Sequence, residues 1–335
     1  MERLFRLLVA GIRCELDSKM GHLKSKSPAL VPIQSGSRTV PYACMAKVAW
    51  INGQIVPLEE AKVSAIDHAH LYGDGLFEGI RFYDRKVFRL DDHLDRLYHG
   101  ITYLGFEMHI PQSELRQIVL DTCRASDEEN GYIRLNVTRG TGLGLDPRNI
   151  DRTPAVVVIV STLSLYPPEL YERGLDVITS SYRMSPSDAL DPRLKCIGGY
   201  ASNIMAKMEG YKVGAHESLK LNHQGQVAEC TGDNVFIIQN NVVKTPHPSV
   251  GLLKGITRDV ALRLSEELGY KTEETFLTVF DFFTAQEAFV TGTAAEIAPM
   301  VKLDGRPIGT GKPGLITLRL MARFREETVT GVPYA

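Results

Sequence analysis

Two short runs rich in apolar residues lie on either side of a turn signal where the regular part of the chain begins, and this arrangement predicts paired strands. Residues 48–51 and 54–57 form two such runs. Asn52 and Gly53 separate them, and this dipeptide is a strong signal for a hairpin with a two-residue turn. We therefore expect a β-hairpin at this point of the chain.

A longer segment, residues 90–104, changes to the helical period. Its apolar residues lie three or four positions apart, and two aspartates open it, where carboxylates favour the helix dipole. By the same reasoning we expect helices at residues 112–125, 201–213 and 257–268, and strands at residues 79–83, 86–89, 132–138, 155–160, 175–180, 218–221, 235–238 and 288–291. Because hairpins and helices are mixed along the chain, the pattern predicts an α+β fold rather than a doubly wound sheet.

The chain has 335 residues, which is more than one hydrophobic core usually supports, so we expect two lobes. Pro167 and Pro168 interrupt the pattern after a buried strand. We place the boundary there, with a small N-terminal lobe at residues 45–165 and a larger lobe at residues 166–335. Residues 1–44 carry seven Lys or Arg against three Asp or Glu, which predicts a leader outside the folded domain; a targeting role for its basic start stays open.

Composition excludes several classes of function. With 44% hydrophobic residues, 23% charged residues and a formal net charge of -2, nothing indicates binding to nucleic acid. The five cysteines have no paired spacing, which predicts neither disulfides nor a metal site and favours a reducing, cytoplasmic compartment. The longest apolar run, residues 155–160, has the length of a strand and is too short to span a membrane. The expected partner is a small molecule.

Candidate chemistry begins at Lys195, which lies in the run Leu-Lys-Cys-Ile-Gly-Gly-Tyr at residues 194–200. Apolar neighbours favour the neutral amine, which is the form that attacks a carbonyl carbon. The two glycines let the backbone approach a flat ligand closely. Taken alone, this segment fits a surface lysine in a glycine loop better than it fits a catalyst.

Three further segments contain residues that could act together with this lysine. Residues 226–236 place Glu229 after alternating strand residues and before a glycine bend, where an inward carboxylate can keep a pyridine nitrogen protonated and make the ring an electron sink. Residues 254–259 and 291–296 place glycine and threonine where free N–H groups can bind phosphate or carboxylate. Each segment by itself also has an ordinary explanation as a strand end or a helix cap.

Together these segments resemble the fold-type IV pyridoxal-phosphate enzymes, and among them the branched-chain amino acid aminotransferases, over roughly residues 48–324. The resemblance implies a two-lobed α+β fold like that of D-amino acid aminotransferase, with a small α/β lobe and a larger lobe that has a barrel-like β core. It assigns Lys195 as the catalytic residue that carries pyridoxal 5'-phosphate. Tyr200 becomes the neighbour of the cofactor's phenolic oxygen, and Glu229 the partner of its pyridine nitrogen.

The resemblance also implies a set of phosphate anchors. Arg96, in the run His-Leu-Asp-Arg-Leu, matches the arginine that reaches the phosphate from the small lobe, and an arginine suits a phosphate because it can donate two parallel hydrogen bonds. Ile256 and Thr257 match the phosphate-binding helix start, and Thr293 matches the second cradle. The backbone of Thr293 and Ala294 is expected to receive the α-carboxylate of the substrate.

Substrate choice is expected to depend on a second group of residues. Tyr72 and Phe77 belong to a run that ends in Phe-Glu-Gly-Ile-Arg, which resembles the branched-chain enzymes and offers an apolar wall for an aliphatic side chain. Tyr132 and Arg134 match the positions at which the family accepts either an aliphatic chain or the second carboxylate of glutamate. Residues 162–166 depart from the family pattern, which has a tryptophan and a tyrosine there.

The predicted function is a reversible, ping-pong transfer of amino groups between L-leucine, L-isoleucine or L-valine and 2-oxoglutarate, in a homodimer or a higher homo-oligomer. The alternatives on the same scaffold are a D-amino acid or (R)-amine transaminase, or an enzyme like aminodeoxychorismate lyase. From other classes, a pyridoxal-phosphate-binding protein without turnover stays open, as does a metal-dependent hydrolase that uses His68, His70 and His93. We expect no metal site, because the spacing of these histidines lacks a recognisable metal-binding partner.

Overall fold

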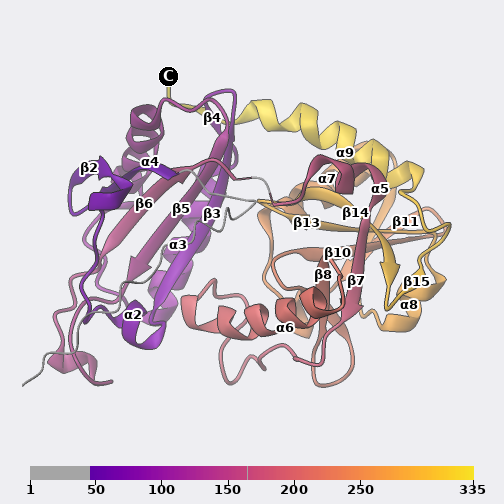
Figure 1. Ribbon diagram of the computed structural model, residues 1–335, viewed down its shortest axis with the longest axis horizontal. Helices are drawn as coiled ribbons and strands as arrows, with labels where there is room; N and C mark the ends of the chain where they lie inside the picture. The colour runs from indigo at the N-terminus through magenta and orange to yellow at the C-terminus, as the bar shows by residue number, and fades with distance from the viewer. Residues whose placement is uncertain (1–45, 164) are drawn as a thin grey trace, which may run out of the picture. The chain divides into compact units, whose positions relative to one another are not determined.

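The hydrophobic patterns fold into two β-sheets with separate cores in the computed structural model, which describes residues 46–163 and 165–335 (Figure 1). The predicted leader, residues 1–44, lies outside the described residues. Among the described residues, none of the helices is both long enough and apolar enough to cross a bilayer.

The first sheet is antiparallel throughout, in the order β16-β4-β3-β5-β6-β1-β2. Its strands are β1 (Ala46–Ile51), β2 (Gln54–Pro57), β3 (Gly75–Tyr83), β4 (Lys86–Val87), β5 (Gly131–Thr138), β6 (Val156–Ser161) and β16 (Val332–Pro333). The segments between them include η1 (Leu58–Glu60), α2 (His68–Tyr72), α3 (Leu90–Leu104), α4 (Gln112–Ser126) and η2 (Pro147–Asn149). The expected hairpin at Asn52 and Gly53 is confirmed as β1 and β2.

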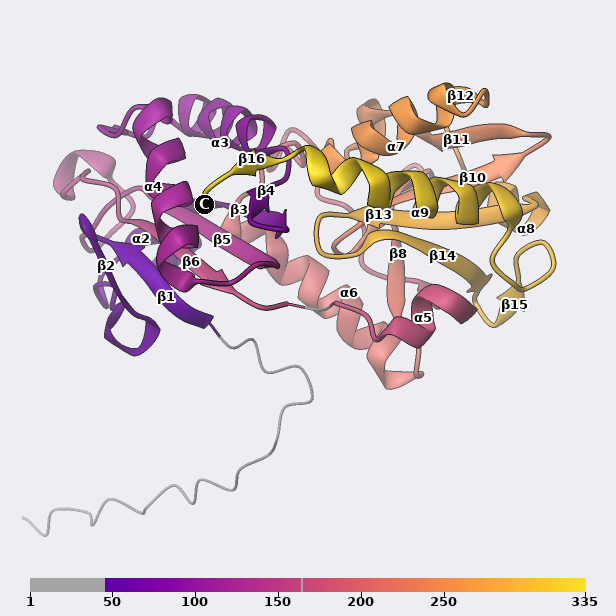
Figure 2. The same ribbon diagram turned by 90° about the horizontal axis from the view of Figure 1, so that it is seen from above.

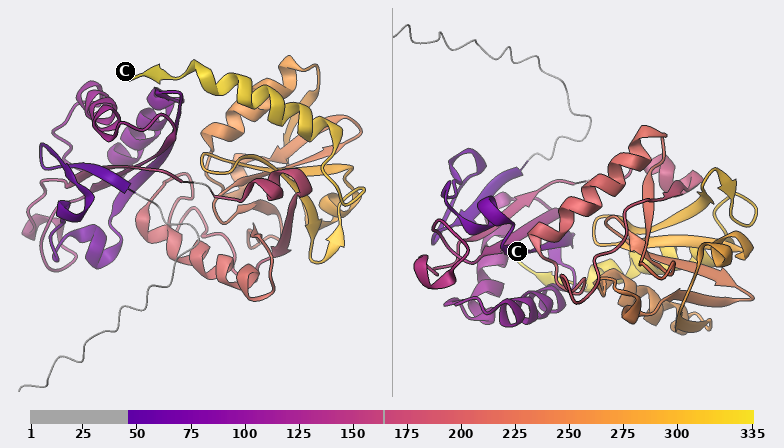
Figure 3. Two further views of the ribbon diagram at one scale, coloured as in Figure 1. Left: turned by 45° about the horizontal axis from the view of Figure 1, so that its top comes forward. Right: turned by 90° about the horizontal axis from the view of Figure 1, so that it is seen from below.

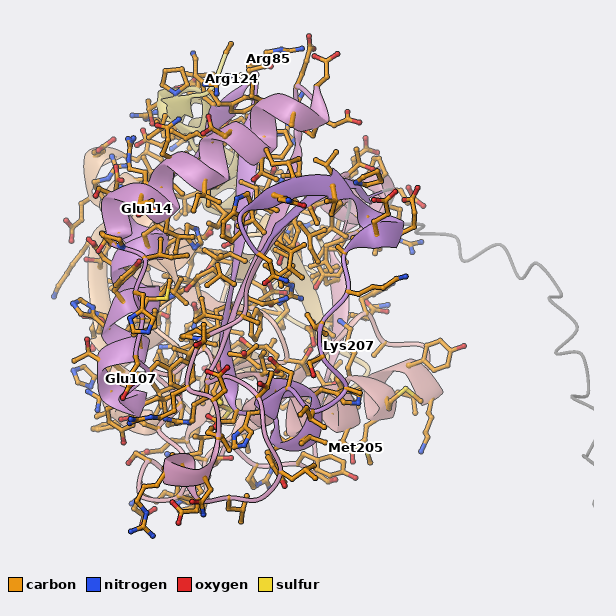
Figure 4. All side chains as sticks on the ribbon, turned by 90° about the vertical axis from the view of Figure 1, so that its left-hand side faces the viewer. Arg85, Glu107, Glu114, Arg124, Met205 and Lys207 are labelled. Carbon is orange, nitrogen blue, oxygen red and sulfur yellow. The ribbon has the colours of Figure 1, made fainter. Side chains whose placement is uncertain are left out.

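Helices α3 and α4 cover one face of this sheet, because both are amphipathic and turn their apolar sides to the strands. Leu115 and Val119 of α4 lie in the core, while Glu114 and Arg124 lie at the surface (Figure 4). Side chains of β3 alternate between the two faces, so Ile80 packs under the helices and Phe77 points to the opposite face. This opposite face also carries Tyr132 and Arg134 of β5, so three of the residues predicted to bind the substrate share it.

The second sheet is mixed, in the order β12-β11-β10-β13-β14-β7-β8-β9, with β15 beside β14. Its strands are β7 (Leu175–Thr179), β8 (Glu217–Leu221), β9 (Val227–Cys230), β10 (Asn234–Gln239), β11 (Val242–Pro246), β12 (Lys271–Thr275), β13 (Glu287–Gly292), β14 (Glu296–Leu303) and β15 (Arg306–Pro307). Three pairs are parallel: β7 with β8, β7 with β14, and β11 with β12. The sheet curls, since its end strand β9 also packs against β10.

The helices of this second part are α5 (Pro168–Arg173), η3 (Ile197–Gly199), α6 (Tyr200–Lys212), η4 (Pro248–Val250), α7 (Ile256–Glu267), α8 (Val279–Thr284), α9 (Leu315–Glu327) and η5 (Thr328–Thr330). Helices α7 and α9 pack on each other and on β13 and β14, as Figure 2 shows for α9. Helix α6 packs on β8 instead. The chain then returns to the first sheet, where β16 pairs with β4 (Figure 3).

Most predicted elements are confirmed within one or two residues, and the α+β class is confirmed. Strand β3 begins earlier than expected, at Gly75 rather than Gly79, because the whole segment is buried and its period of two is hidden. The sequence pattern did not predict α2, α5, α8, α9, β11, β12 or β14 as elements. Strand β12 is mostly polar and half-exposed, and β14 contains Pro299, so neither has the alternation typical of a strand.

Candidate active site

Lys195 lies in the loop that leads into η3, where this loop runs beside the start of β3. The Phe77 N–H donates to the Lys195 carbonyl oxygen at 3.0 Å, and the Gly198 N–H donates to the Gly73 carbonyl oxygen at 3.0 Å. A Cβ on Gly73 would lie 2.5 Å from the Gly198 Cα, so the close approach of the two segments requires glycine. The backbone of Lys195 is thus held by the first sheet although the residue belongs to the second part of the chain.

The amine of Lys195 points toward two aromatic rings. Its Nζ lies 2.9 Å from the Tyr200 Oη and 4.8 Å from the centre of the Phe77 ring. Tyr200 is the first residue of α6, and its ring meets the Phe77 ring edge-on with centroids 4.6 Å apart. A half-buried amine beside a phenol in an apolar wall can act as a nucleophile toward a carbonyl group.

Glu229 is a buried carboxylate that faces the same cavity as Lys195. It lies on β9, is 8% exposed, and accepts hydrogen bonds at 3.0 Å from the Asn234 Nδ2 and from the Leu253 N–H. Burial raises the pKa of Glu229 to about 7, and the hydrogen bond from Leu253 and the positive charges of Lys195 and Lys220 only partly oppose this effect. A cationic ring nitrogen placed next to Glu229 would supply the charge that this carboxylate needs.

Arg96 reaches the cavity from α3 and is oriented by a buried pair of side chains. Its Nε and Nη2 donate to the two carboxylate oxygens of Glu78 at 2.7 and 2.8 Å, and its Nη1 donates to the Lys254 carbonyl oxygen at 2.9 Å. His93 Nδ1 lies 2.7 Å from the Glu78 Oε2, and Glu78 is fully buried. A guanidinium has five N–H groups, so two remain for a phosphate.

Glu78 is a site residue that the sequence reasoning did not assign. Burial alone would raise the pKa of Glu78, but the Arg96 charge and the hydrogen bonds from His93 and Arg96 outweigh it and hold that pKa far below its usual range. Burial lowers the pKa of His93, so its imidazole is neutral and its Nδ1–H donates to Glu78. The signal that could have shown Glu78 is a lone carboxylate between Leu76 and Ile80, two apolar residues on the same strand face.

The start of α7 and the turn after β13 provide further donors. Ile256 and Thr257 are buried at the first turn of a 12-residue helix that has no side-chain cap, so their N–H groups are open to an anion. Thr293 follows β13 in the tight turn to β14. Thr291, near the end of β13, has a buried Oγ1 without a hydrogen-bond partner among the described residues.

One cavity brings these groups together, and its lining includes every residue that was predicted to bind the cofactor: Arg96, Lys195, Tyr200, Glu229, Ile256, Thr257 and Thr293. The chemistry of this set suits pyridoxal 5'-phosphate. It offers an amine for the aldehyde, a phenol for the phenolic oxygen, a carboxylate for the ring nitrogen, and N–H and O–H donors for the phosphate. The unpaired Thr291 hydroxyl supports the fit, because it leaves one more donor for a ligand.

The predicted substrate wall lies on the face of the first sheet that carries Phe77. The Arg134 guanidinium lies 4.3 Å from the centre of the Phe77 ring, and among the described residues no carboxylate pairs with it. Tyr132 lies two residues earlier on β5, with its Oη over Gly79, where a Cβ would be only 2.0 Å away. Ala294 lies in the turn after Thr293. The side chains of Phe77, Arg134 and Tyr132 therefore share one face beside Lys195.

Two tyrosines are placed differently. Tyr72 on α2 is 45% exposed and accepts a hydrogen bond from the Gly144 N–H at 3.1 Å. Like Phe77, Tyr132 and Arg134, it is not part of the lining of the cavity around Lys195. Tyr166 is buried in the core of the second part, and its Oη donates to the Asp233 Oδ2 at 3.1 Å. Burial and the nearby Glu217 raise the pKa of Asp233 well above its usual range. The substrate-binding role of Tyr72 therefore stays a prediction.

The histidines of the metal-dependent alternative do not form one site. The Nδ1 of His68 lies 3.1 Å from the Asp74 Oδ2, whereas His93 belongs to the Glu78 network. His70 lies on α2. Residues 46–163 and 165–335 contain no cluster of three or more His, Cys, Asp or Glu side chains arranged to hold a metal ion.

Comparisons with known proteins agree with this geometry. The model of the class IV amino-transferase family matches residues 75–303, the segment that runs from β3 to the end of β14. A putative branched-chain-amino-acid aminotransferase of Methanocaldococcus jannaschii is 44% identical over 278 residues, which cover 83% of this chain and 95% of that protein.

Two solved structures have the same fold. The crystal structure of the Escherichia coli branched-chain amino acid aminotransferase superposes with a TM-score of 0.81 at 31% identity, over 84% of this chain and 94% of that one. The branched-chain amino acid aminotransferase of Thermobaculum terrenum, in its PLP-form, reaches a TM-score of 0.76 at 31% identity, over 84% and 94% of the two chains. The expected two-lobed fold is thereby confirmed.

Proposed function

The chain belongs to the class IV aminotransferase family, and we propose that it transfers amino groups between branched-chain L-amino acids and 2-oxoglutarate, with pyridoxal 5'-phosphate as its cofactor. The observation that carries the proposal is the cavity in which Lys195, Glu229 and the predicted phosphate anchors meet. The relatives named above, which are branched-chain aminotransferases, support this choice of substrate.

Three residues of the cavity divide the chemical work. When bound, the cofactor supplies an electron sink for the charge that develops at the Cα of the amino acid. Lys195 is the nucleophile that would hold the cofactor, and its Nζ would then take the proton from the Cα as general base and deliver it as general acid to the cofactor carbon C4′. The Tyr200 Oη, 2.9 Å away, positions this amine. Glu229 keeps its negative charge next to the ring nitrogen.

Four residues are proposed to bind the phosphate of the cofactor. Arg96 offers two N–H groups from the side of α3, and its direction is set by Glu78. Ile256 and Thr257 offer the positive end of α7, and Thr293 closes the other side from the turn after β13. Binding from three separate elements would hold the cofactor ring in one orientation. The Cα proton of the bound amino acid is then kept within reach of the Lys195 Nζ.

The wall beside Lys195 suits two kinds of amino donor. Phe77 is an apolar surface for a leucine, isoleucine or valine side chain. Arg134 lies over that ring without a carboxylate partner among the described residues, so it is available for the second carboxylate of glutamate or 2-oxoglutarate. One pocket can therefore accept both substrates of a ping-pong reaction in turn. The backbone at Thr293 and Ala294 is proposed to receive the α-carboxylate that both have in common.

A donor and acceptor assay tests the proposal. We expect L-leucine, L-isoleucine and L-valine to be the best donors with 2-oxoglutarate, ahead of D-alanine and an (R)-amine with pyruvate. D-alanine or the (R)-amine as the best donor would contradict the assignment. The purified chain should also show a near-visible absorption band from the bound cofactor, and this band should be absent in Lys195→Ala.

We also propose that a second copy of the chain covers an apolar side of α6. Four large hydrophobic residues on this helix are exposed by 45–76%: Ile204, Met205, Met208 and Tyr211 (Met205 is labelled in Figure 4). Their spacing places most of them on one side of the helix, where a monomer would leave them in water. Sedimentation should show a dimer or higher oligomer, and Met208→Glu should shift it toward the monomer. A monomer that is fully active would overturn this proposal.

A cytoplasmic location is proposed from the cysteines. Cys123, Cys196 and Cys230 are buried and free, and burial raises the pKa of Cys123 and of Cys230 above the usual range of a thiol. Such thiols need no oxidising compartment. Fractionation of cells that express the native chain tests this, and recovery with an oxidising compartment would contradict it.

A further inference from the structure

Lys220 is a buried lysine that the proposed reaction does not use. It lies on β8, is 1% exposed, and is among the largest fully buried side chains of the described residues. Its Nζ contacts the Ser202 Oγ at 3.1 Å and the Asn203 Oδ1 at 2.7 Å, and both of these partners are neutral. Lysine is almost never fully buried unless it is paired with an opposite charge. The position of Lys220 therefore needs an explanation.

The opposite charge nearest to it in the sheet is Glu229. The register of β8 and β9 pairs Lys220 directly with Glu229, so the two side chains leave the same face of the sheet next to each other. Both line one cavity, together with Tyr200, Ser202 and Asn203. The lysine thus lies behind the carboxylate that faces the ring nitrogen in the proposed function.

The other charged or titratable groups around Glu229 do not replace this lysine. Lys195 faces Glu229 from the loop before η3, but in the proposed function its amine is committed to the cofactor. Asp233 faces it from the turn after β9 and adds negative charge, which opposes ionisation of Glu229. Tyr200 lines the same cavity from α6. Within the described residues, Lys220 is therefore the positive side chain near Glu229 that stays available once Lys195 has bound the cofactor.

We propose that Lys220 is a positioning residue that keeps Glu229 ionised, so that Glu229 can hold the ring nitrogen of the cofactor in its protonated form. The proposal rests on the proposed function for its consequence, but the cross-strand register of Lys220 with Glu229 and the cavity that both line are independent of it. Burial lowers the pKa of Lys220, and the Glu229 charge partly opposes this effect, just as the Lys220 charge partly opposes the rise in the pKa of Glu229.

A purely structural role makes a different prediction. Lys220 also joins β8 to the start of α6 through Ser202 and Asn203, and Asn203 in turn donates to the Thr231 carbonyl oxygen at 2.8 Å. If these hydrogen bonds were its only role, a neutral donor at position 220 would serve as well. Lys220→Gln keeps a donor and loses the charge, whereas Ser202→Ala keeps the charge and loses one hydrogen bond.

The test measures ionisation of Glu229 directly. The full chain is labelled with carboxyl-13C glutamate, and the Glu229 signal is assigned by its loss in Glu229→Gln. Without cofactor, we expect the wild-type midpoint near pH 7. Lys220→Gln and Lys220→Met should raise this midpoint by about one pH unit or more, because an opposite charge has been removed, and Ser202→Ala should leave it unchanged. Lys220→Met keeps a side chain of similar size and loses both the charge and the hydrogen bonds.

The result that would overturn the proposal is a Glu229 midpoint in Lys220→Gln equal to that of the wild type, or an equal shift in Ser202→Ala. Wild-type protein gives a second measurement that needs no variant. The Lys220 15N signal must be that of an ammonium where Glu229 ionises, and a neutral amine there would also overturn it.

The same samples are then loaded with pyridoxal 5'-phosphate, where the Glu229 signal should stay that of a carboxylate in wild type and become partly protonated in Lys220→Gln. A chain that binds no cofactor would contradict the proposed function, while the titration would still decide the role of Lys220.

Discussion

Glu78→Gln removes the buried carboxylate that orients Arg96 and keeps the shape of the side chain. In the native chain Glu78 is fully buried and accepts hydrogen bonds from His93 and, twice, from Arg96. Glutamine can accept at one position only, and its NH₂ group then faces a donor. The change therefore leaves the guanidinium, whose side chain is 16% exposed, without an opposite charge.

The expected loss of stability is large. Removing one partner of a buried, hydrogen-bonded ion pair costs about 3–5 kcal/mol, because the remaining charge is left unpaired in a poorly solvated place. Since Arg96 is not wholly buried, we expect the lower end, about 3 kcal/mol in the free energy of unfolding at neutral pH. Arg96 also loses its orientation toward the phosphate, so the dissociation constant of pyridoxal 5'-phosphate should rise at least about tenfold, which corresponds to about 1.4 kcal/mol.

The loss should depend on pH in one direction. The pKa of Glu78 is lower in the folded chain than its usual value, which is about 4.3 for a glutamate in an unfolded chain. Its contribution to stability is therefore complete above that value and is lost as the pH falls toward the pKa of the folded state. The difference between wild type and Glu78→Gln should be constant near neutral pH and shrink in acid.

Urea unfolding at several pH values measures this difference, and titration with pyridoxal 5'-phosphate measures the affinity. Glu267→Gln is the matched control, because Glu267 is 40% exposed and pairs with Arg263 and Arg323 at the surface. Solvent screens an exposed pair, so the control should lose far less stability than Glu78→Gln. The reasoning is wrong if Glu78→Gln is as stable as this control, or if its deficit grows as the pH falls.

Three further changes separate the roles of the other site residues. Glu229→Gln should retain bound cofactor but lower kcat by about a hundredfold or more, because the ring nitrogen loses its charged partner. An unchanged kcat in a rapid-mixing assay would exclude Glu229 as the partner of the ring nitrogen. Arg134→Met should raise KM for 2-oxoglutarate at least about tenfold while KM for L-leucine changes little, since only the former has a second carboxylate; equal changes in initial-rate measurements would contradict it. Gly79→Ala places a Cβ 2.0 Å from the Tyr132 Oη, so kcat/KM for L-leucine should fall while cofactor affinity stays unchanged. A weaker cofactor affinity with unchanged kcat/KM would count against a substrate wall at this position.

The sequence predicted the cofactor residues only when its separate segments were taken together, since the segment around Lys195 alone fits a surface lysine better. Lys195 and Tyr200 are five positions apart, and Glu229 precedes a glycine bend. The resemblance to a family then placed Arg96 and Thr293 with them, although they come from distant parts of the chain. All of them line one cavity in the structure, while their individual roles stay proposals.

The surroundings of these cofactor residues could not be predicted from the sequence. Glu78 has no local partner, since Arg96 lies 18 positions further on and the contact exists only once α3 packs on β3. Tyr72 is exposed on α2 and its hydroxyl contacts Gly144, so its predicted role at the substrate stays a prediction. A motif identifies which residue types are present, but burial depends on which other elements cover them.

By itself, the sequence determined the period of each main element, the α+β class and the residues that can carry the chemistry, since these depend on neighbours along the chain. Only the tertiary structure decided the charge environment of those residues. Glu229 lies beside Lys220 because β8 and β9 are in register, and Arg96 reaches the cavity because Glu78 pairs with it from a neighbouring strand. The spacing of these residues along the chain does not show that they come into contact. The low dielectric that strengthens their interaction exists only inside the packed fold.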